Sequence, residues 1–93
     1  MNKPLTIRAV ISGRVQGVFY RLETQRAAIA LQIKGWVKNL PNGDVEAVFQ
    51  AEPDQVKKIL DWCHNGPPNA QVTSVKDQPL SDCDPFDTFE IRY

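Results

Sequence analysis

The sequence consists of short segments separated by glycine or proline. In some segments apolar residues recur at every second position, and in others they recur at helical spacing. Residues 5–12 are apolar at every second position, which predicts a strand with one buried face. Residues 20–32 contain neither glycine nor proline and carry a stripe at helical spacing, which predicts a helix that Gly35 ends. The strand's buried face consists of Leu5, Ile7, Ala9 and Ile11, and the helical stripe of Tyr20, Thr24, Ala27, Ala28 and Leu31.

The remaining segments predict a hairpin, a second helix and further strand. Residues 35–39 and 45–50 are strand-like, and the Asn42-Gly43 pair between them favours a tight turn. Pro53 suits the first turn of a helix, and Gly66-Pro67-Pro68 would end it. The buried face of that helix would comprise Val56, Ile59, Leu60 and Cys63. Residues 70–75 and 89–93 also read as strands, as two separate ones or as parts of one long last stretch.

This order of strand, helix, hairpin, helix and strand is typical of the split βαβ, ferredoxin-like arrangement. We therefore expect an α+β sandwich (βαββαβ) with an antiparallel sheet and both helices on one face. The 93 residues are enough for one domain, residues 1–93. The same fold hosts RNA binders, metal chaperones, ligand sensors and small hydrolases, so function has to be argued from particular residues.

Charge and hydropathy indicate which kinds of partner, among nucleic acids, membranes and small anions, the protein could bind. Residues 1–40 carry seven basic side chains and one acidic, whereas residues 41–93 carry four basic and ten acidic, for a net charge of zero. That balance disfavours a nonspecific nucleic-acid binder but allows a compact positive site for one small anion. No apolar run approaches the ~20 residues of a membrane span, and the N-terminus lacks a secretory signal. We expect a cytoplasmic monomer with no nucleic-acid or membrane partner.

Metal-binding and cysteine patterns are sparse. Cys63, Cys83 and the single histidine, His64, match no zinc spacing, so we expect no metal and no cofactor. Cys63 reads as a small apolar residue of a helix and Cys83 as a loop thiol. A bridge between the two is geometrically possible, although nothing in the sequence requires it.

The segment from Gly13 to Arg21 joins the first strand to the first helix. Its two glycines let consecutive backbone N–H groups converge on an anion, and a helix start adds unpaired donors. Arg21 could bind phosphate oxygens through its guanidinium group. The alternative is an ordinary strand-to-helix turn in which Arg21 is solvated or ion-paired.

Asn39 stands at the end of a predicted strand, where asparagine is a poor strand former. It could simply initiate the turn that follows. Its amide, with one acceptor and two donors, could instead position a water molecule or a ligand.

Taken together, these stretches resemble the two signature segments of the acylphosphatases. The matching residues are Gly13-Arg14-Val15-Gln16-Gly17-Val18-x-Tyr20-Arg21 and Gly35-Trp36-Val37-Lys38-Asn39-x-x-x-Gly43-x-Val45. The resemblance continues through Gly66-Pro67-Pro68-x-Ala70-x-Val72 and Phe89-x-Ile91-Arg92, so it covers nearly the whole chain.

The resemblance implies a small metal-free hydrolase that splits acyl phosphates into a carboxylate and inorganic phosphate. Arg21 would bind the phosphate oxygens, and Asn39 would hold the attacking water. The phosphate-binding loop would consist of Val15, Gln16, Gly17, Val18, Phe19 and Tyr20. The alternative within the same fold is a module that binds phosphate or acyl phosphate without turnover.

Two residues depart from the family pattern. Ala51 stands where the family usually has a glycine after the third strand, a position distant from the expected site. Phe19 stands where the family often has a small residue, and its ring would narrow access to the loop or alter how the loop sits.

Overall fold

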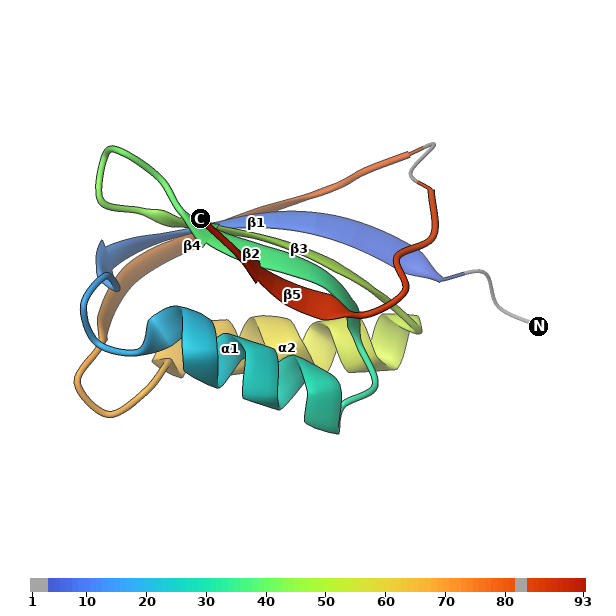
Figure 1. The fold of residues 1–93 in the computed structure, drawn as a ribbon, viewed down its shortest axis with the longest axis horizontal. Helices are drawn as coiled ribbons and strands as arrows, with labels where there is room; N and C mark the ends of the chain where they lie inside the picture. The colour runs from blue at the N-terminus through green and yellow to red at the C-terminus, as the bar shows by residue number, and fades with distance from the viewer. Residues whose placement is uncertain (1–3, 82–83) are drawn as a thin grey trace.

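A five-stranded sheet with two helices on one face forms the protein in the computed structural model, which describes residues 4–81 and 84–93 (Figure 1). The strand order is β4-β1-β3-β2-β5. The elements are β1 (Leu5–Arg14), α1 (Tyr20–Ala30), β2 (Lys34–Asn39), β3 (Val45–Ala51), α2 (Pro53–Asn65), β4 (Gln71–Pro79) and β5 (Phe89–Arg92). The expected ferredoxin-like α+β class is confirmed.

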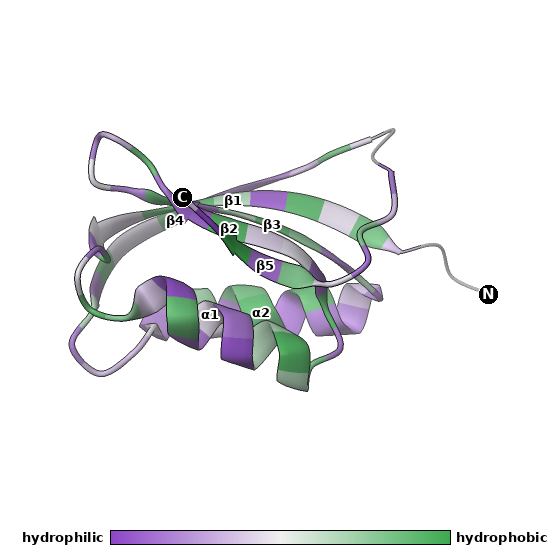
Figure 2. Cartoon of the chain, viewed as in Figure 1, coloured by the Kyte–Doolittle hydropathy of each residue, from purple (hydrophilic) through white to green (hydrophobic). Residues whose placement is uncertain are grey.

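The core lies between the sheet and the helices, where the periodicity predicted it. Ile7, Ala9 and Ile11 of β1 are buried, and apolar and polar residues alternate over residues 5–9 of this strand (Figure 2). The buried residues of the two helices are Tyr20, Thr24 and Ala28 of α1, and Val56, Ile59 and Cys63 of α2. Removing these side chains from water is the main driving force that packs both helices on one face.

The first helix ends earlier than predicted. Gln32, three residues before Gly35, adopts a left-handed conformation, with φ at 60°. The Gln32 N–H then bonds to the Ile29 carbonyl, and the Ile33 N–H to the Ala28 carbonyl. These two bonds form a Schellman cap, which satisfies carbonyls at the end of α1.

The sheet differs from the expected antiparallel arrangement at one edge, where β5 runs parallel to β2. The strands β4 and β5 are separate and occupy opposite edges. The connection between them crosses one end of the sheet, where the Leu80 N–H bonds to Thr6 and the Gly35 N–H to Thr88. Because β5 therefore begins at the same end as β2, it has to run in the same direction. Local periodicity carries no information about such a crossing.

Neither described helix is long and apolar enough to cross a bilayer. Cys63 is fully buried in α2, as predicted, and has no disulfide partner among the described residues. Cys83, and with it the possible bridge, lies outside the described residues. Ala51 closes β3 opposite Leu5 without a positive φ, so alanine meets the backbone demand at this position.

Candidate active site

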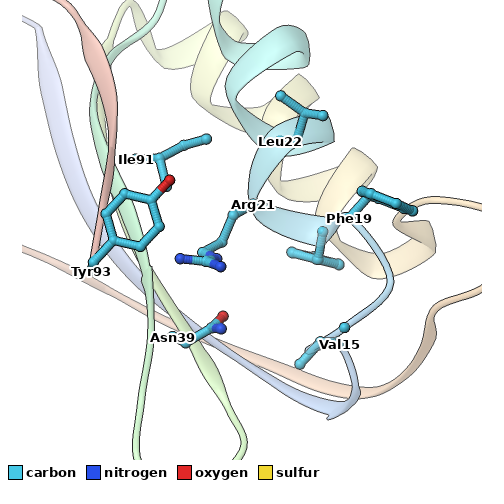
Figure 3. A pocket seen from close by; sticks show the side chains of 9 residues that line it. Val15, Phe19, Arg21, Leu22, Asn39, Ile91 and Tyr93 are labelled. Atoms are coloured by element: carbon cyan, nitrogen blue, oxygen red, sulfur yellow. The ribbon is translucent and has the colours of Figure 1, made fainter.

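A pocket lies where three strands end. β1 and β2 both run antiparallel to β3, and β5 runs parallel to β2, so the carboxyl ends of β1, β2 and β5 meet at one end of the sheet. The pocket, of about 410 Å³, opens there between these strand ends and the start of α1 (Figure 3). Its lining consists of Val15, Gly17, Phe19, Tyr20, Arg21, Leu22, Asn39, Ile91 and Tyr93.

The structure brings most of the predicted site residues into this pocket. Arg21 and Asn39 line it from different elements, the first turn of α1 and the last residue of β2. Four of the six predicted loop residues also line it, whereas Gln16 and Val18 do not. Val18 is instead buried in the core. The side chain of Gln16 holds the loop in place from outside the pocket.

The loop before α1 has the backbone shape of an anion site. Gly17 and Phe19 both have positive φ, 75° and 64°, while Val18 between them does not. Such alternation turns successive N–H groups toward one concavity. No side chain in the described part of the protein caps α1, so its first N–H groups remain available at the positive end of the helix dipole. The loop and the helix start thus form one backbone surface suited to a phosphate.

Two contacts fix this loop. The Gln16 side-chain amide donates to the carbonyls of Leu40 and Asp44, at 2.9 and 2.8 Å, and so ties the loop to the β2–β3 hairpin. The Tyr20 hydroxyl donates to the Cys63 carbonyl at 2.8 Å, which ties the start of α1 to α2. Burial raises the pKa of the Tyr20 phenol far above its ordinary value, so Tyr20 is an anchor and not an acid or base.

The Arg21 guanidinium lies over the Tyr93 ring, 4.9 Å from its centroid, and extends toward Asn39 (Figure 3). Within residues 4–81 and 84–93 no carboxylate forms an ion pair with it. The ring holds the planar group by a cation–π contact that leaves its N–H edges available. The charge is therefore positioned but not neutralised by these residues.

The Asn39 side chain supplies a hydrogen-bond acceptor at the floor of the site. Its Oδ1 is buried, and no donor from the described residues reaches it. Asn42 shapes the turn instead, since its Oδ1 accepts from the Asp44 N–H at 3.0 Å. A buried acceptor without a partner costs about 1–3 kcal/mol, so its retention requires an explanation. A donor held in the pocket would satisfy it.

Sequence reasoning missed three residues of the lining: Leu22, Ile91 and Tyr93. Ile91 belonged to the closing motif, but nothing in the motif indicated that β5 would reach the site. Leu22 and Tyr93 carry no pattern that local analysis can interpret. Ile91 and Tyr93 reach the pocket because β5 lies next to β2 in the sheet.

Metal-ligating residues do not cluster among the described residues, because no group of three His, Cys, Asp or Glu side chains forms there. Burial also raises the pKa of the Cys63 thiol to about 12, so it stays protonated near neutral pH. The chemistry that this pocket offers consists of backbone donors, one guanidinium and one amide.

Comparison with known proteins supports one family. The acylphosphatase family model matches residues 7–91. An acylphosphatase from Rubrobacter xylanophilus is 49% identical, covering 81% of this chain and 70% of its own length. One from Natronomonas pharaonis is 45% identical over 99% of both chains. The solved structure of an acylphosphatase from Coxiella burnetii superposes with a TM-score of 0.92 at 38% identity, covering 97% of this chain and 94% of its own.

The fold and the pocket define a small ferredoxin-like α+β protein with a polar site at the carboxyl ends of its strands. The chain belongs to the acylphosphatase family.

Proposed function

We propose that this protein is an acylphosphatase, which hydrolyses the carboxyl–phosphate bond of acyl phosphates to a carboxylate and inorganic phosphate. Family membership supports the reaction class. The observation that carries the proposal for the site is the buried Oδ1 of Asn39, which no donor of the described residues reaches, in the same pocket as the Arg21 guanidinium, with which no described carboxylate pairs. The Asn39 oxygen can accept a hydrogen bond from a water molecule, and the Arg21 guanidinium can bind a phosphate.

In the proposed mechanism, the phosphate sits on the N–H groups of the loop 15–20, and Arg21 binds its oxygens. Asn39 Oδ1 accepts a hydrogen bond from a water molecule and orients its oxygen toward phosphorus. A new P–O bond forms as the bond from phosphorus to the acyl oxygen breaks, and the carboxylate leaves with that electron pair. The proton of the water passes to a phosphate oxygen of the substrate, since an amide cannot act as a strong base.

This set of groups is sufficient because an acyl phosphate already has a good leaving group. The departing carboxylate needs little or no protonation, so positioning and charge stabilisation can supply most of the rate enhancement. Loop donors and Arg21 stabilise the charge on the transferring phosphoryl group. The proposed mechanism has no step that requires a metal ion, and turnover should therefore survive a chelator.

Asn39→Ala tests the role of the amide. We expect hydrolysis of benzoyl phosphate, measured with EDTA present, to fall by a factor of about 10² to 10³ in kcat. The inhibition constant of inorganic phosphate should change little, because Arg21 and the loop are intact. Asn42→Ala, an asparagine of the adjacent turn, is the matched control and should retain kcat.

The outcomes distinguish a catalytic acylphosphatase from a protein that only binds phosphate. Near-normal turnover in Asn39→Ala would refute the water-holding role. A wild-type protein that binds phosphate but hydrolyses no acyl phosphate would instead be a binding module. The single domain over residues 1–93 and the monomeric state remain predictions, and light scattering with size-exclusion chromatography tests the second.

A further inference from the structure

Exposed apolar side chains gather at the mouth of the active-site pocket. Among the described residues, four large hydrophobic side chains are exposed: Phe19 (73%), Leu22 (37%), Ile29 (56%) and Tyr93 (97%). Three of these four line the pocket that contains Arg21 and Asn39. Tyr93 meets the Arg21 guanidinium with its ring, whereas Phe19 and Leu22 present exposed apolar surface on the side of α1 (Figure 3).

Phe19 is held at the mouth at a cost to stability. A bulky residue with φ at 64° is a true backbone outlier, and such conformations cost on the order of 1–3 kcal/mol. Its ring is also left mostly in water, so core packing does not repay that cost. Strain of this kind concentrates at functional sites and ligand contacts. The combination indicates a side chain retained for what it contacts outside the fold.

We infer that Phe19 and Leu22 form the binding surface for the acyl group of the substrate, and that this group is apolar and larger than acetyl. The inference rests on the proposed function. Arg21 and the loop would hold the phosphate end, so the group on the other side of the carboxyl has to extend past the rim of the pocket. Ile91 lines the opposite side of the same pocket.

The physical basis is removal of apolar surface from water. An aromatic or long aliphatic acyl group covers Phe19 and Leu22, whereas acetyl is too short to cover them. Each methylene or comparable group in an apolar site contributes roughly tenfold to discrimination, and less where the site is open. Selectivity should therefore depend on these two side chains, while the phosphate contacts stay the same for every substrate.

The test compares kcat/KM for benzoyl phosphate and acetyl phosphate. We expect the wild type to favour benzoyl phosphate, and Phe19→Ser and Leu22→Ser each to lower that ratio by about three- to tenfold. Phe19→Leu, which keeps an apolar side chain at the same strained position, should retain most of the ratio. Ile29→Ser removes another exposed hydrophobic residue, whose exposure lies between those of Phe19 and Leu22 and which does not line this pocket, and it should leave the ratio unchanged.

An unchanged ratio in Phe19→Ser and Leu22→Ser, with hydrolysis of both substrates preserved, would overturn the inference and leave the proposed function in place. If the wild-type protein hydrolysed neither benzoyl phosphate nor acetyl phosphate, the proposed function would be overturned. In that case the affinities of benzoylphosphonate and acetylphosphonate, measured by calorimetry in the same variants, still decide whether this rim binds the acyl group. Equal affinities for the two phosphonates would refute it.

Discussion

Asn39 shows how one residue is placed for chemistry at the expense of stability. Its backbone ends β2 opposite Val45. Its side-chain amide takes no part in the sheet, and the turn that follows is shaped by the side chain of Asn42 instead. Replacing Asn39 with an apolar residue would remove the unsatisfied acceptor and so could stabilise the fold. Such a trade between stability and activity is common for groups that serve a reaction.

The buried Cys63 thiol makes stability depend on pH at alkaline values. Its pKa rises from about 9 to about 12 because burial disfavours the thiolate. The unfolded chain therefore loses this proton first, and the free energy of unfolding should fall by roughly 1 kcal/mol per pH unit between about pH 9 and pH 12. Urea titrations of the wild type and Cys63→Ala measure this contribution.

Cys63→Ala should be less stable at neutral pH, because it leaves a small cavity, yet it should lose stability less steeply as pH rises. Burial raises the pKa of Tyr20 in both proteins, but Cys63 raises it further in the wild type, so the difference between the two slopes measures Cys63 together with its coupling to Tyr20. If the free energy of unfolding fell equally steeply with pH in both proteins, the prediction that the buried thiol stays protonated would be wrong. Both measurements are best made with Cys83→Ser in each protein, so that its thiol does not contribute.

Among the elements, β2 depends on a glycine that allows β3 to approach closely. Gly35 has a φ of 139°, and an added Cβ would overlap the Val48 carbonyl oxygen. The same strand carries Asn39 at its other end, so the packing of β2 against β3 also positions the active site.

Gly35→Ala should therefore destabilise the protein by about 3 kcal/mol, through both backbone strain and the clash with β3. Gly43→Ala is the matched comparison, because Gly43 also has a positive φ, 98°, but an added Cβ there meets no atom within 4 Å. Its cost should be about 1 kcal/mol, from strain alone. Chemical denaturation measures both, and equal losses would show that close packing at Gly35 is unimportant.

At the scale of the whole molecule, the sheet order mixes charges that the sequence separates. The basic first forty residues supply β1 and β2, and the acidic remainder supplies β3 between them. Glu46 of β3 consequently pairs with both Arg8 and Lys38. Arg21 forms no such pair among the described residues, so it stays available for an anion at the end of the sheet.

Binding of inorganic phosphate should stabilise the folded protein as a whole. A ligand that binds only the folded state, at one hundred times its Kd, raises the free energy of unfolding by about 2.7 kcal/mol. Thermal unfolding in phosphate, compared with sodium chloride at equal ionic strength, measures this shift. The shift should largely disappear in Arg21→Ala and persist in Arg26→Ala, whose arginine pairs with Glu23 on the surface of the same helix. An equal shift in both variants would contradict the role of Arg21.

Local patterns in the sequence were enough to predict nearly every element, because strand and helix periodicity reflect which face each segment buries. They also predicted Arg21 and Asn39 as candidate site residues, since both stand in recognisable segments at element ends. Two features depended on long-range contacts: the parallel placement of β5, and the wall that Ile91 and Tyr93 form. The path of a connection and the neighbour of a strand are set by packing between distant segments, which no local spacing encodes. The end of α1 was missed for a different reason: its cap is a local backbone conformation at Gln32, a residue type that does not mark such a cap.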